Sequence, residues 1–215
     1  MKVAIVDYGL GNLFSINQAC LHVGLDTKIT SDFNEIKNAD AMILPGVGAF
    51  GDAMNHLKKS ELIEPIKEFV KTGKPFLGIC LGMQLMFTES EEFGSNEGLN
   101  FIKGKIIKFP SHDSYNNIVK VPQIQWNQIS KNTDELWNNS ALKDIPEKSY
   151  MHFVHSFYAK PEDNNHILTY TEYAGINYAS AVIKDNMTGF QFHPEKSGEL
   201  GLKIYENWSK TIKKQ

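Results

Sequence analysis

The first half of the chain alternates short apolar runs with longer stretches whose apolar residues recur every three or four positions. Short apolar runs predict buried strands, and the longer periodic stretches predict amphipathic helices. The expected strands are 2–7, 26–30, 41–44 and 76–79, and the expected helices are 12–23, 49–57, 61–71 and 83–90. Strands that alternate with helices predict a parallel sheet with helices on both faces.

The second half has a different pattern. Antiparallel strands are expected where apolar and polar residues alternate, at 105–109, 121–129, 150–159, 166–173 and 179–192. The pair Asp185-Asn186 predicts a hairpin turn inside the last of these segments, and 198–212 reads as a closing amphipathic helix. The predicted fold class is α/β, an open and mostly parallel sheet flanked by helices, with an antiparallel β extension in the second half.

Composition is that of an ordinary globular chain. With 215 residues, 41% of them hydrophobic and 22% charged, a single domain spanning 1–215 is expected. The net charge of -3 and the absence of arginine give no general attraction to nucleic acid. No apolar run reaches membrane-spanning length and the chain opens directly on a strand, so we expect no membrane partner and a cytoplasmic location. Two cysteines do not suggest a disulfide framework.

The most informative motif is Gly78-Ile79-Cys80-Leu81-Gly82, at the junction of a predicted strand and a predicted helix. Gly-x-Cys-x-Gly is the thiol counterpart of the Gly-x-Ser-x-Gly nucleophile elbow. Glycines beside the nucleophile permit a sharp turn, and the N-terminus of the following helix favours the reactive thiolate. Cys80 is therefore the candidate nucleophile, although the motif alone would also suit a buried structural cysteine in a glycine-rich turn.

A second motif, Phe190-Gln191-Phe192-His193-Pro194-Glu195, lies near the C-terminus. A histidine at a strand end can reach the elbow of a neighbouring strand, and Glu195 can accept the other imidazole N–H. Nucleophile, base and orienting carboxylate then follow one another as Cys80, His193 and Glu195. Taken alone, His193 would suit a turn and Glu195 the surface, but together with Cys80 they indicate catalysis.

These motifs resemble the class I (triad) glutamine amidotransferases, and further segments resemble one subfamily, the glutaminase subunit of imidazole glycerol phosphate synthase. The further segments are 7–13, 45–54, 153–158 and 192–197, so the resemblance covers essentially the whole chain. It implies a flavodoxin-like fold, hydrolysis of L-glutamine without a cofactor, and a (β/α)8 cyclase subunit as partner in a heterodimer. That partner would use the ammonia to form imidazole glycerol phosphate and an aminoimidazole carboxamide ribotide in histidine biosynthesis.

Amide hydrolysis by a thiolate passes through a tetrahedral oxyanion that needs preorganised donors. The backbone N–H of Leu81, directly after the nucleophile, is the first candidate donor, and the resemblance implies a second one at Gly48. The resemblance also implies that substrate is held by Gln84, His155, Ser156 and Phe157. Gln84 would equally suit an ordinary polar position in the first turn of a helix.

The resemblance places Asn12 and Trp126 at the partner interface. No metal site is expected, because His152 and His155 are three apart on a predicted strand and point to opposite faces. The family pattern at 121–127 is Val-Pro-His-x-Gly-Trp-Asn. This chain departs from it, because Gln123 and Gln125 stand in place of the His and the Gly. Since this segment lies toward the partner in the family, the departure concerns the identity of the partner.

Three alternatives therefore remain beside the leading hypothesis. One is a paralogous glutaminase subunit that feeds a cyclase-like synthase amidating another acceptor, such as a surface sugar. Another is a free-standing cysteine peptidase or γ-glutamyl hydrolase on the same fold, which needs no partner. The third is a non-catalytic binding module, against which the intact set of Cys80, His193 and Glu195 argues.

Overall fold

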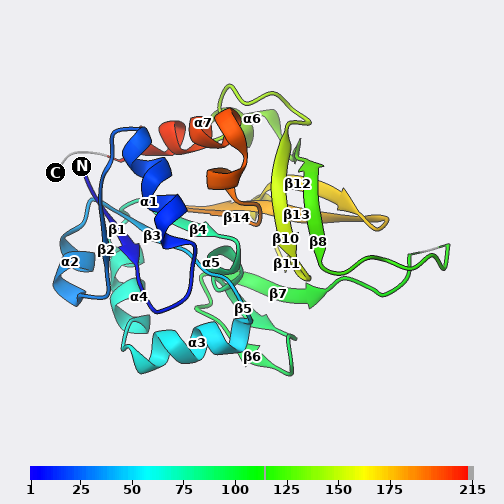
Figure 1. Ribbon diagram of the computed structural model, residues 1–215, viewed down its shortest axis with the longest axis horizontal. Coiled ribbons are helices and arrows are strands. Elements are labelled where there is room, and N and C mark those ends of the chain that lie inside the picture. The colour runs from blue at the N-terminus through cyan, green and yellow to red at the C-terminus, as the bar shows by residue number, and fades with distance from the viewer. Residues whose placement is uncertain (114, 213–215) are drawn as a thin grey trace.

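A computed structural model describes residues 1–113 and 115–212 and arranges them around one large sheet (Figure 1). The strands are β1 (Lys2–Val6), β2 (Asp26–Thr30), β3 (Ala41–Leu44), β4 (Phe76–Ile79), β5 (Phe87–Ser90), β6 (Asn96–Glu97), β7 (Ile102–Lys108), β8 (Gln123–Gln128), β9 (Ser130–Lys131), β10 (Tyr150–His155), β11 (Phe157–Pro161), β12 (Ile167–Tyr173), β13 (Ile176–Lys184) and β14 (Met187–Phe190). The helices are α1 (Leu13–His22), α2 (Phe33–Asn38), α3 (Phe50–Lys59), α4 (Ile63–Lys71), α5 (Leu81–Gln84), α6 (Asp134–Asn138) and α7 (Gly198–Ser209).

One half of the sheet has the strand order β2-β1-β3-β4-β14, and all of these strands run parallel. This is the doubly wound order of flavodoxin-like folds, in which ligands bind beyond the carboxyl ends of the strands. β3 and β4 are buried along their whole length, as expected of strands that helices cover on both faces. The predicted α/β fold class is confirmed.

Alternate residues of the parallel strands belong to two separate apolar cores. Val3 and Ile5 of β1 pack into the core under α1 and α7, which includes Trp208. Ala4 and Val6 pack into the core under α2, α3 and α4. Figure 1 shows α1, α6 and α7 above the sheet and α3 and α4 below it. This period of two positions is what a strand needs to bury both faces.

The antiparallel extension follows from β14. A hairpin with Asp185 at a positive φ of 52° joins β13 to β14, as the sequence predicts. β13 also pairs antiparallel with β12 and β11, and β11 continues to β7. β8 and β10 form a separate two-stranded sheet, which lies at the right of Figure 1.

Two predicted elements are wrong. The helix expected at 83–90 ends at Gln84, and 87–90 form β5, which pairs with β6 and β7. The strand expected at 150–159 is broken at Ser156, since β10 pairs with β8 whereas β11 pairs with β7 and β13. In both cases pairing with distant strands decides the structure, and local pattern carries no information about those partners.

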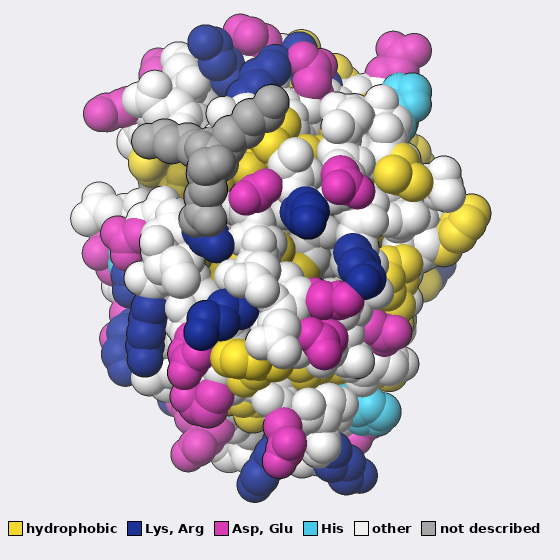
Figure 2. Space-filling view, turned by 90° about the vertical axis from the view of Figure 1, so that its left-hand side faces the viewer, with side chains coloured by type: hydrophobic (Ala, Val, Ile, Leu, Met, Phe, Trp, Pro, Cys, Tyr) yellow, Lys and Arg dark blue, Asp and Glu magenta, His cyan; other side chains and the backbone are white. Residues whose placement is uncertain are grey.

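No helix in 1–113 or 115–212 combines the length and apolarity needed to cross a bilayer. Figure 2 shows the end of the molecule that forms the left side of Figure 1. Lys side chains and acidic side chains are interspersed there, so this face presents no field of a single sign.

The turn from β4 into α5 depends on close backbone contacts at glycine. A Cβ on Gly82 would lie 1.8 Å from the carbonyl oxygen of Leu44, and a Cβ on Gly78 would lie 2.9 Å from the carbonyl oxygen of Gly82. Neither contact is possible for a side chain, because the opposing atoms belong to the backbone. These glycines therefore allow α5 to pack directly against the ends of β3 and β4.

We expect Gly82→Ala to lower the free energy of unfolding by about 3 kcal/mol or to prevent folding, since overpacking against backbone cannot relax locally. Gly51→Ala is the matched control, because the three atoms nearest to its Cβ would all belong to the Asn96 side chain, which can move, and Ala favours the helix. Denaturant unfolding of both variants measures the difference. Equal stability of the two variants would contradict the close packing of α5.

Candidate active site

Cys80 lies between β4 and α5 with φ 53° and ψ -111°, a backbone conformation that L-residues rarely adopt. Strain of this kind occurs at nucleophile elbows, where the surrounding structure holds it in place. The residue is 7% exposed. Its Sγ lies 3.9 Å from the carbonyl oxygen of Val154 and 3.8 Å from Nε2 of Gln191.

His193 and Glu195 form the next part of the site. Nδ1 of His193 lies 2.8 Å from Oε1 of Glu195, whose carboxylate is fully buried. Nε2 of His193 is buried and bonds to no other group in the part of the chain that the structure describes. Asn12 donates from Nδ2 to the same Glu195 oxygen at 3.4 Å. The predicted interface residue Asn12 therefore also supports the carboxylate that orients the imidazole.

The charges of the site oppose the effect of burial on the imidazole. Burial lowers the pKa of His193, but the sulfur of Cys80 and the carboxylate of Glu195 outweigh it and raise the pKa to about 10. The Glu195 carboxylate and the Cys80 sulfur on either side of the ring therefore favour the imidazolium form of His193. An imidazolium beside a sulfur nucleophile can donate its proton to a leaving amine.

The two cysteines differ in what they can do. Cys20 of α1 is fully buried in the core, and burial together with the charge of Glu195 raises the pKa of its thiol to about 12. A thiol kept protonated in an apolar core is a poor nucleophile. Cys80, by contrast, lines a cavity that also contains His193.

That cavity has a volume of about 300 Å³, at the low end of the range for small-molecule sites. Its lining includes eight of the eleven residues that the sequence analysis selects: Cys80, His193, Gly48, Leu81, Gln84, His155, Ser156 and Phe157. Of the other three, Glu195 lies behind His193 and Asn12 behind Glu195, whereas Trp126 is on β8. The carboxyl ends of β3, β4 and β14 thus bring the predicted site residues together.

Glu92 is a cavity residue that the sequence analysis does not find. Its Oε2 accepts a hydrogen bond from the backbone N–H of Phe50 at 2.6 Å, and burial raises the pKa of the carboxyl group. Glu92 follows β5, a segment for which the sequence predicts a helix. Its neighbours in sequence include other acidic residues, and it belongs to no recognisable motif. Nothing in the local pattern distinguishes Glu92 from a solvated surface acid.

The predicted substrate-holding side chains are already engaged. Gln84 donates from Nε2 to the carbonyl oxygen of Phe157 at 3.0 Å and to Oε1 of Gln191 at 2.9 Å. The ring of His155 bonds to the Phe157 carbonyl oxygen at 2.7 Å and to the Tyr178 hydroxyl at 3.2 Å. Burial lowers the pKa of His155 to about 4, so this imidazole is neutral and donates from Nδ1.

The segment that departs from the family pattern is a strand, and its two replaced positions differ. Gln123 is fully buried and its side-chain amide lies 3.0 Å from the Tyr178 hydroxyl, so it does not belong to the exposed surface of the strand. Gln125 is exposed on β8. Trp126 is 50% exposed, and its ring meets that of His152 edge to face at 6.0 Å. His152 in turn lies 6.3 Å from the ring of His193.

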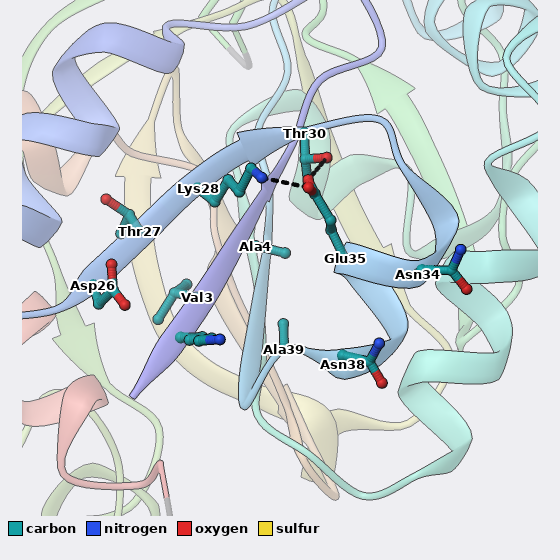
Figure 3. A pocket seen from close by; sticks show the side chains of 11 residues that line it. Val3, Ala4, Asp26, Thr27, Lys28, Thr30, Asn34, Glu35, Asn38 and Ala39 are labelled. Carbon is teal, nitrogen blue, oxygen red and sulfur yellow. Dashed lines mark hydrogen bonds and ion pairs between the residues drawn. The ribbon is translucent and has the colours of Figure 1, made fainter.

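A further cavity, of about 420 Å³, lies against β1, β2 and α2 (Figure 3). Lys28 and Thr30 both bond to the Glu35 carboxylate beside it. These groups satisfy one another, and the lining contains neither a cysteine nor a histidine. Across residues 1–113 and 115–212, no three His, Cys, Asp or Glu side chains are grouped so as to hold a metal ion.

Known proteins resemble this chain in sequence and in fold. The family described as "Glutamine amidotransferase class-I" matches residues 4–210. The imidazole glycerol phosphate synthase subunit HisH 1 of Legionella pneumophila (strain Paris) is 49% identical, with 96% of this chain and 98% of that protein covered. Subunit HisH of Caldanaerobacter subterraneus subsp. tengcongensis is 47% identical over 98% of each chain. The structure of PurLQS from Thermotoga maritima, at 17% identity, shares the fold with a TM-score of 0.74 over 99% of each chain.

The raised pKa of His193 makes stability depend on pH. The folded-state pKa of about 10 lies above the ordinary histidine pKa of 6.5, so the imidazolium contributes stability that is fully present below about pH 6.5 and is lost as pH rises toward 10. We expect the difference in free energy of unfolding between the wild type and His193→Gln to shrink across this window. Denaturant unfolding at several pH values measures it, and His22→Gln, which removes an exposed histidine, is the control. A difference that stays constant with pH would contradict a charged His193.

Proposed function

The chain belongs to the class I glutamine amidotransferase family, and on this premise we propose that it is the glutaminase subunit of an imidazole glycerol phosphate synthase. It hydrolyses L-glutamine to glutamate and ammonia and delivers the ammonia to a separate synthase subunit. The observation that carries the proposal is the cavity at the strand ends, where a strained cysteine faces an imidazole held by a buried carboxylate. Relatives 42–49% identical over nearly their whole length bear the name of that subunit.

The proposed reaction uses Cys80, His193 and Glu195 in distinct roles. The Cys80 thiolate attacks the side-chain carboxamide carbon of glutamine. The His193 imidazolium gives its Nε2 proton to the leaving nitrogen, the C–N bond breaks, and ammonia departs. His193 then takes a proton from water, which attacks the glutamyl thioester, and glutamate and the thiolate are released. Glu195 fixes the tautomer of the ring through Nδ1 and stabilises its positive charge.

The oxyanion would be held by two backbone N–H groups. Leu81 is the first residue of α5, and within the described residues its N–H donates to no protein acceptor. Gly48 lies in an exposed turn with φ +96° and open space at its Cβ position, so its peptide has room to reorient. We propose that the Gly48 peptide supplies the second donor and that docking of the partner sets its orientation.

The rest of the cavity suits an amino acid. The Glu92 carboxylate provides a counter-charge for the α-ammonium group of glutamine. Both ring nitrogens of His155 are bonded within the protein, so we propose that 155–157 contact substrate through their backbone at the break between β10 and β11. Gln84 would shape the cavity mainly through its bonds to Phe157 and Gln191.

The proposed partner is a (β/α)8 cyclase subunit that converts the ammonia into imidazole glycerol phosphate and an aminoimidazole carboxamide ribotide. Exposed apolar side chains include Val47, which lines the cavity from the glycine-rich turn, and Ile124 and Trp126 on β8. Apolar and aromatic residues of this kind are enriched at protein interfaces. The path of rings from Trp126 through His152 to His193 links that surface to the base.

The paralogue that feeds a different synthase remains the second candidate. The exposed replacement at Gln125 favours it, whereas the buried replacement at Gln123 does not bear on partner choice. Co-purification of the chain with a candidate cyclase, followed by an assay for imidazole glycerol phosphate, distinguishes the two. A free-standing hydrolase would turn over glutamine or peptides at full rate without any partner.

We expect Cys80→Ala to abolish glutamine-dependent synthesis by the complex and to leave ammonia-dependent synthesis intact, because the thiol serves only to release ammonia. Cys20→Ala is the matched control and should keep both activities, since Cys20 lies in the core and not in the cavity. Product formation with each nitrogen source measures the effect. Loss of ammonia-dependent synthesis in Cys80→Ala would assign Cys80 a structural role and refute the proposed chemistry.

The isolated chain should be a poor glutaminase that its partner activates about 10²–10³-fold, the effect of supplying one oxyanion donor. Trp126→Ala should weaken the complex about tenfold or more, because exposed tryptophans often dominate interfaces. Phe33→Ala, on α2 at the far edge of the sheet, is the control. Steady-state kinetics and titration with the cyclase test both points. Full turnover by the isolated chain would favour the free-standing hydrolase.

A further inference from the structure

Gln191 is a buried polar residue that the proposed reaction does not use. It lies between the end of β14 and His193, and it is 0% exposed. Its side chain is not part of the cavity lining, so it does not reach substrate. Its Nε2 nevertheless lies 3.8 Å from the sulfur of Cys80. A fully buried amide needs hydrogen-bond partners for both its nitrogen and its oxygen, and here one of those partners is the nucleophile.

The direction of this amide follows from its neighbours. A backbone carbonyl can only accept, so Gln84 must turn its NH₂ group toward the carbonyl oxygen of Phe157 at 3.0 Å. The same NH₂ group lies 2.9 Å from the Gln191 side chain and therefore requires the acceptor atom of that amide. Oε1 of Gln191 thus faces Gln84, and Nε2 must face the sulfur. The Phe157 carbonyl thus fixes the orientation of the Gln191 amide through the side chain of Gln84.

We propose that Gln191 is a positioning residue for the nucleophile, whose orientation-locked amide N–H holds the sulfur of Cys80 toward the cavity and favours its thiolate. This inference rests on the proposed function, because it assigns a residue to the same site. The thiol proton passes to Nε2 of His193, and the amide keeps its own proton and only donates a hydrogen bond.

The surroundings of the sulfur show why the donor matters. The thiol has an acceptor in the Val154 carbonyl at 3.9 Å, which favours the protonated form. The thiolate has no proton to donate to that carbonyl oxygen and is stabilised only by hydrogen-bond donors. His193 would supply a charged donor once its Nε2 takes up the thiol proton, and Gln191, two residues earlier in the segment after β14, supplies a neutral one. A buried anion with two donors is much better satisfied than one with a single donor.

The network also connects two parts of the site. Phe157 follows the break between β10 and β11, where the proposed substrate contacts lie, and its carbonyl oxygen accepts from both Gln84 and His155. The order of contacts is therefore Phe157, Gln84, Gln191 and Cys80. A single rigid set of hydrogen bonds positions the substrate wall and the nucleophile together.

Gln191→Met tests the inference, because Met matches the length of Gln and removes the donor. The rate of alkylation of Cys80 by iodoacetamide is measured against pH on the full-length chain, with the labelled site identified by mass spectrometry. We expect the midpoint of the profile to move upward by about one pH unit, the shift that a tenfold change in thiolate fraction produces. The rate at high pH should stay near that of the wild type. Gln84→Met should move the midpoint in the same direction, since the Gln191 amide then loses its fixed orientation.

Ser180→Ala is the matched control, because it removes buried hydrogen bonds to Thr169 and Thr171 on the adjoining strand β12 but leaves the sulfur untouched. An unchanged midpoint in folded Gln191→Met overturns the inference and leaves the proposed function standing. An equal shift in Ser180→Ala also overturns it, because the effect would then come from general loosening. If Gln191→Met does not fold, Gln84→Met decides, with an unchanged midpoint as the refuting result. Failure of the wild-type complex to use glutamine would refute the proposed function without affecting the alkylation result.

Discussion

The pairing of β14 with β4 is the constraint on which the site depends. The two strands are parallel, with Phe190 opposite Ile79, and the backbone N–H of Cys80 donates to the carbonyl oxygen of Phe190 at 2.7 Å. This register places the residue after β4 beside the segment that carries His193, although more than half of the chain separates them. A slip of one residue would turn alternate side chains to the other face of the sheet. The full burial of both strands on two apolar cores makes such a slip costly.

A buried charged imidazole loses its hydration, so each of its ring nitrogens needs a polar or anionic partner within the protein. The imidazole of His193 has the Glu195 carboxylate on one nitrogen and the Cys80 sulfur facing the other. Glu195 is itself supported by Asn12 from the start of α1. Replacing a buried ionic set by apolar residues is often neutral or stabilising, so this set does not serve stability first. In the proposed reaction this set keeps a protonated imidazole beside the proposed nucleophile, and the fold holds the two in place.

The parts of the molecule that sequence predicts are those whose cause is local. The β4–α5 turn is predictable because glycine at positions 78 and 82 meets a backbone requirement that the motif expresses directly. The Cys80, His193 and Glu195 set is predictable because each has a role that its residue type can fill. The local pattern predicts a helix where β5 lies, because it carries no information about the pairing of β5 with β7. Glu92 and Gln191 could not be found for the same reason, since their importance comes from the atoms they face and not from their neighbours in sequence.

The position of β8 and β10 explains how a partner could influence chemistry without contributing to it. These strands form their own sheet, yet β10 is tied to the segment that carries His193, because the backbone N–H of His193 donates to the carbonyl oxygen of His152 at 3.0 Å. The His152 N–H in turn donates to Ser197 at 3.0 Å. On its other side β10 pairs with β8, which presents Ile124 and Trp126 to solvent. A protein that covers these side chains would press on this small sheet, and through it on the segment that carries His193. Coupling between sites requires an element with two arrangements, and the exposed Gly48 turn beside the cavity, with open space at its Cβ position, has room for a second one.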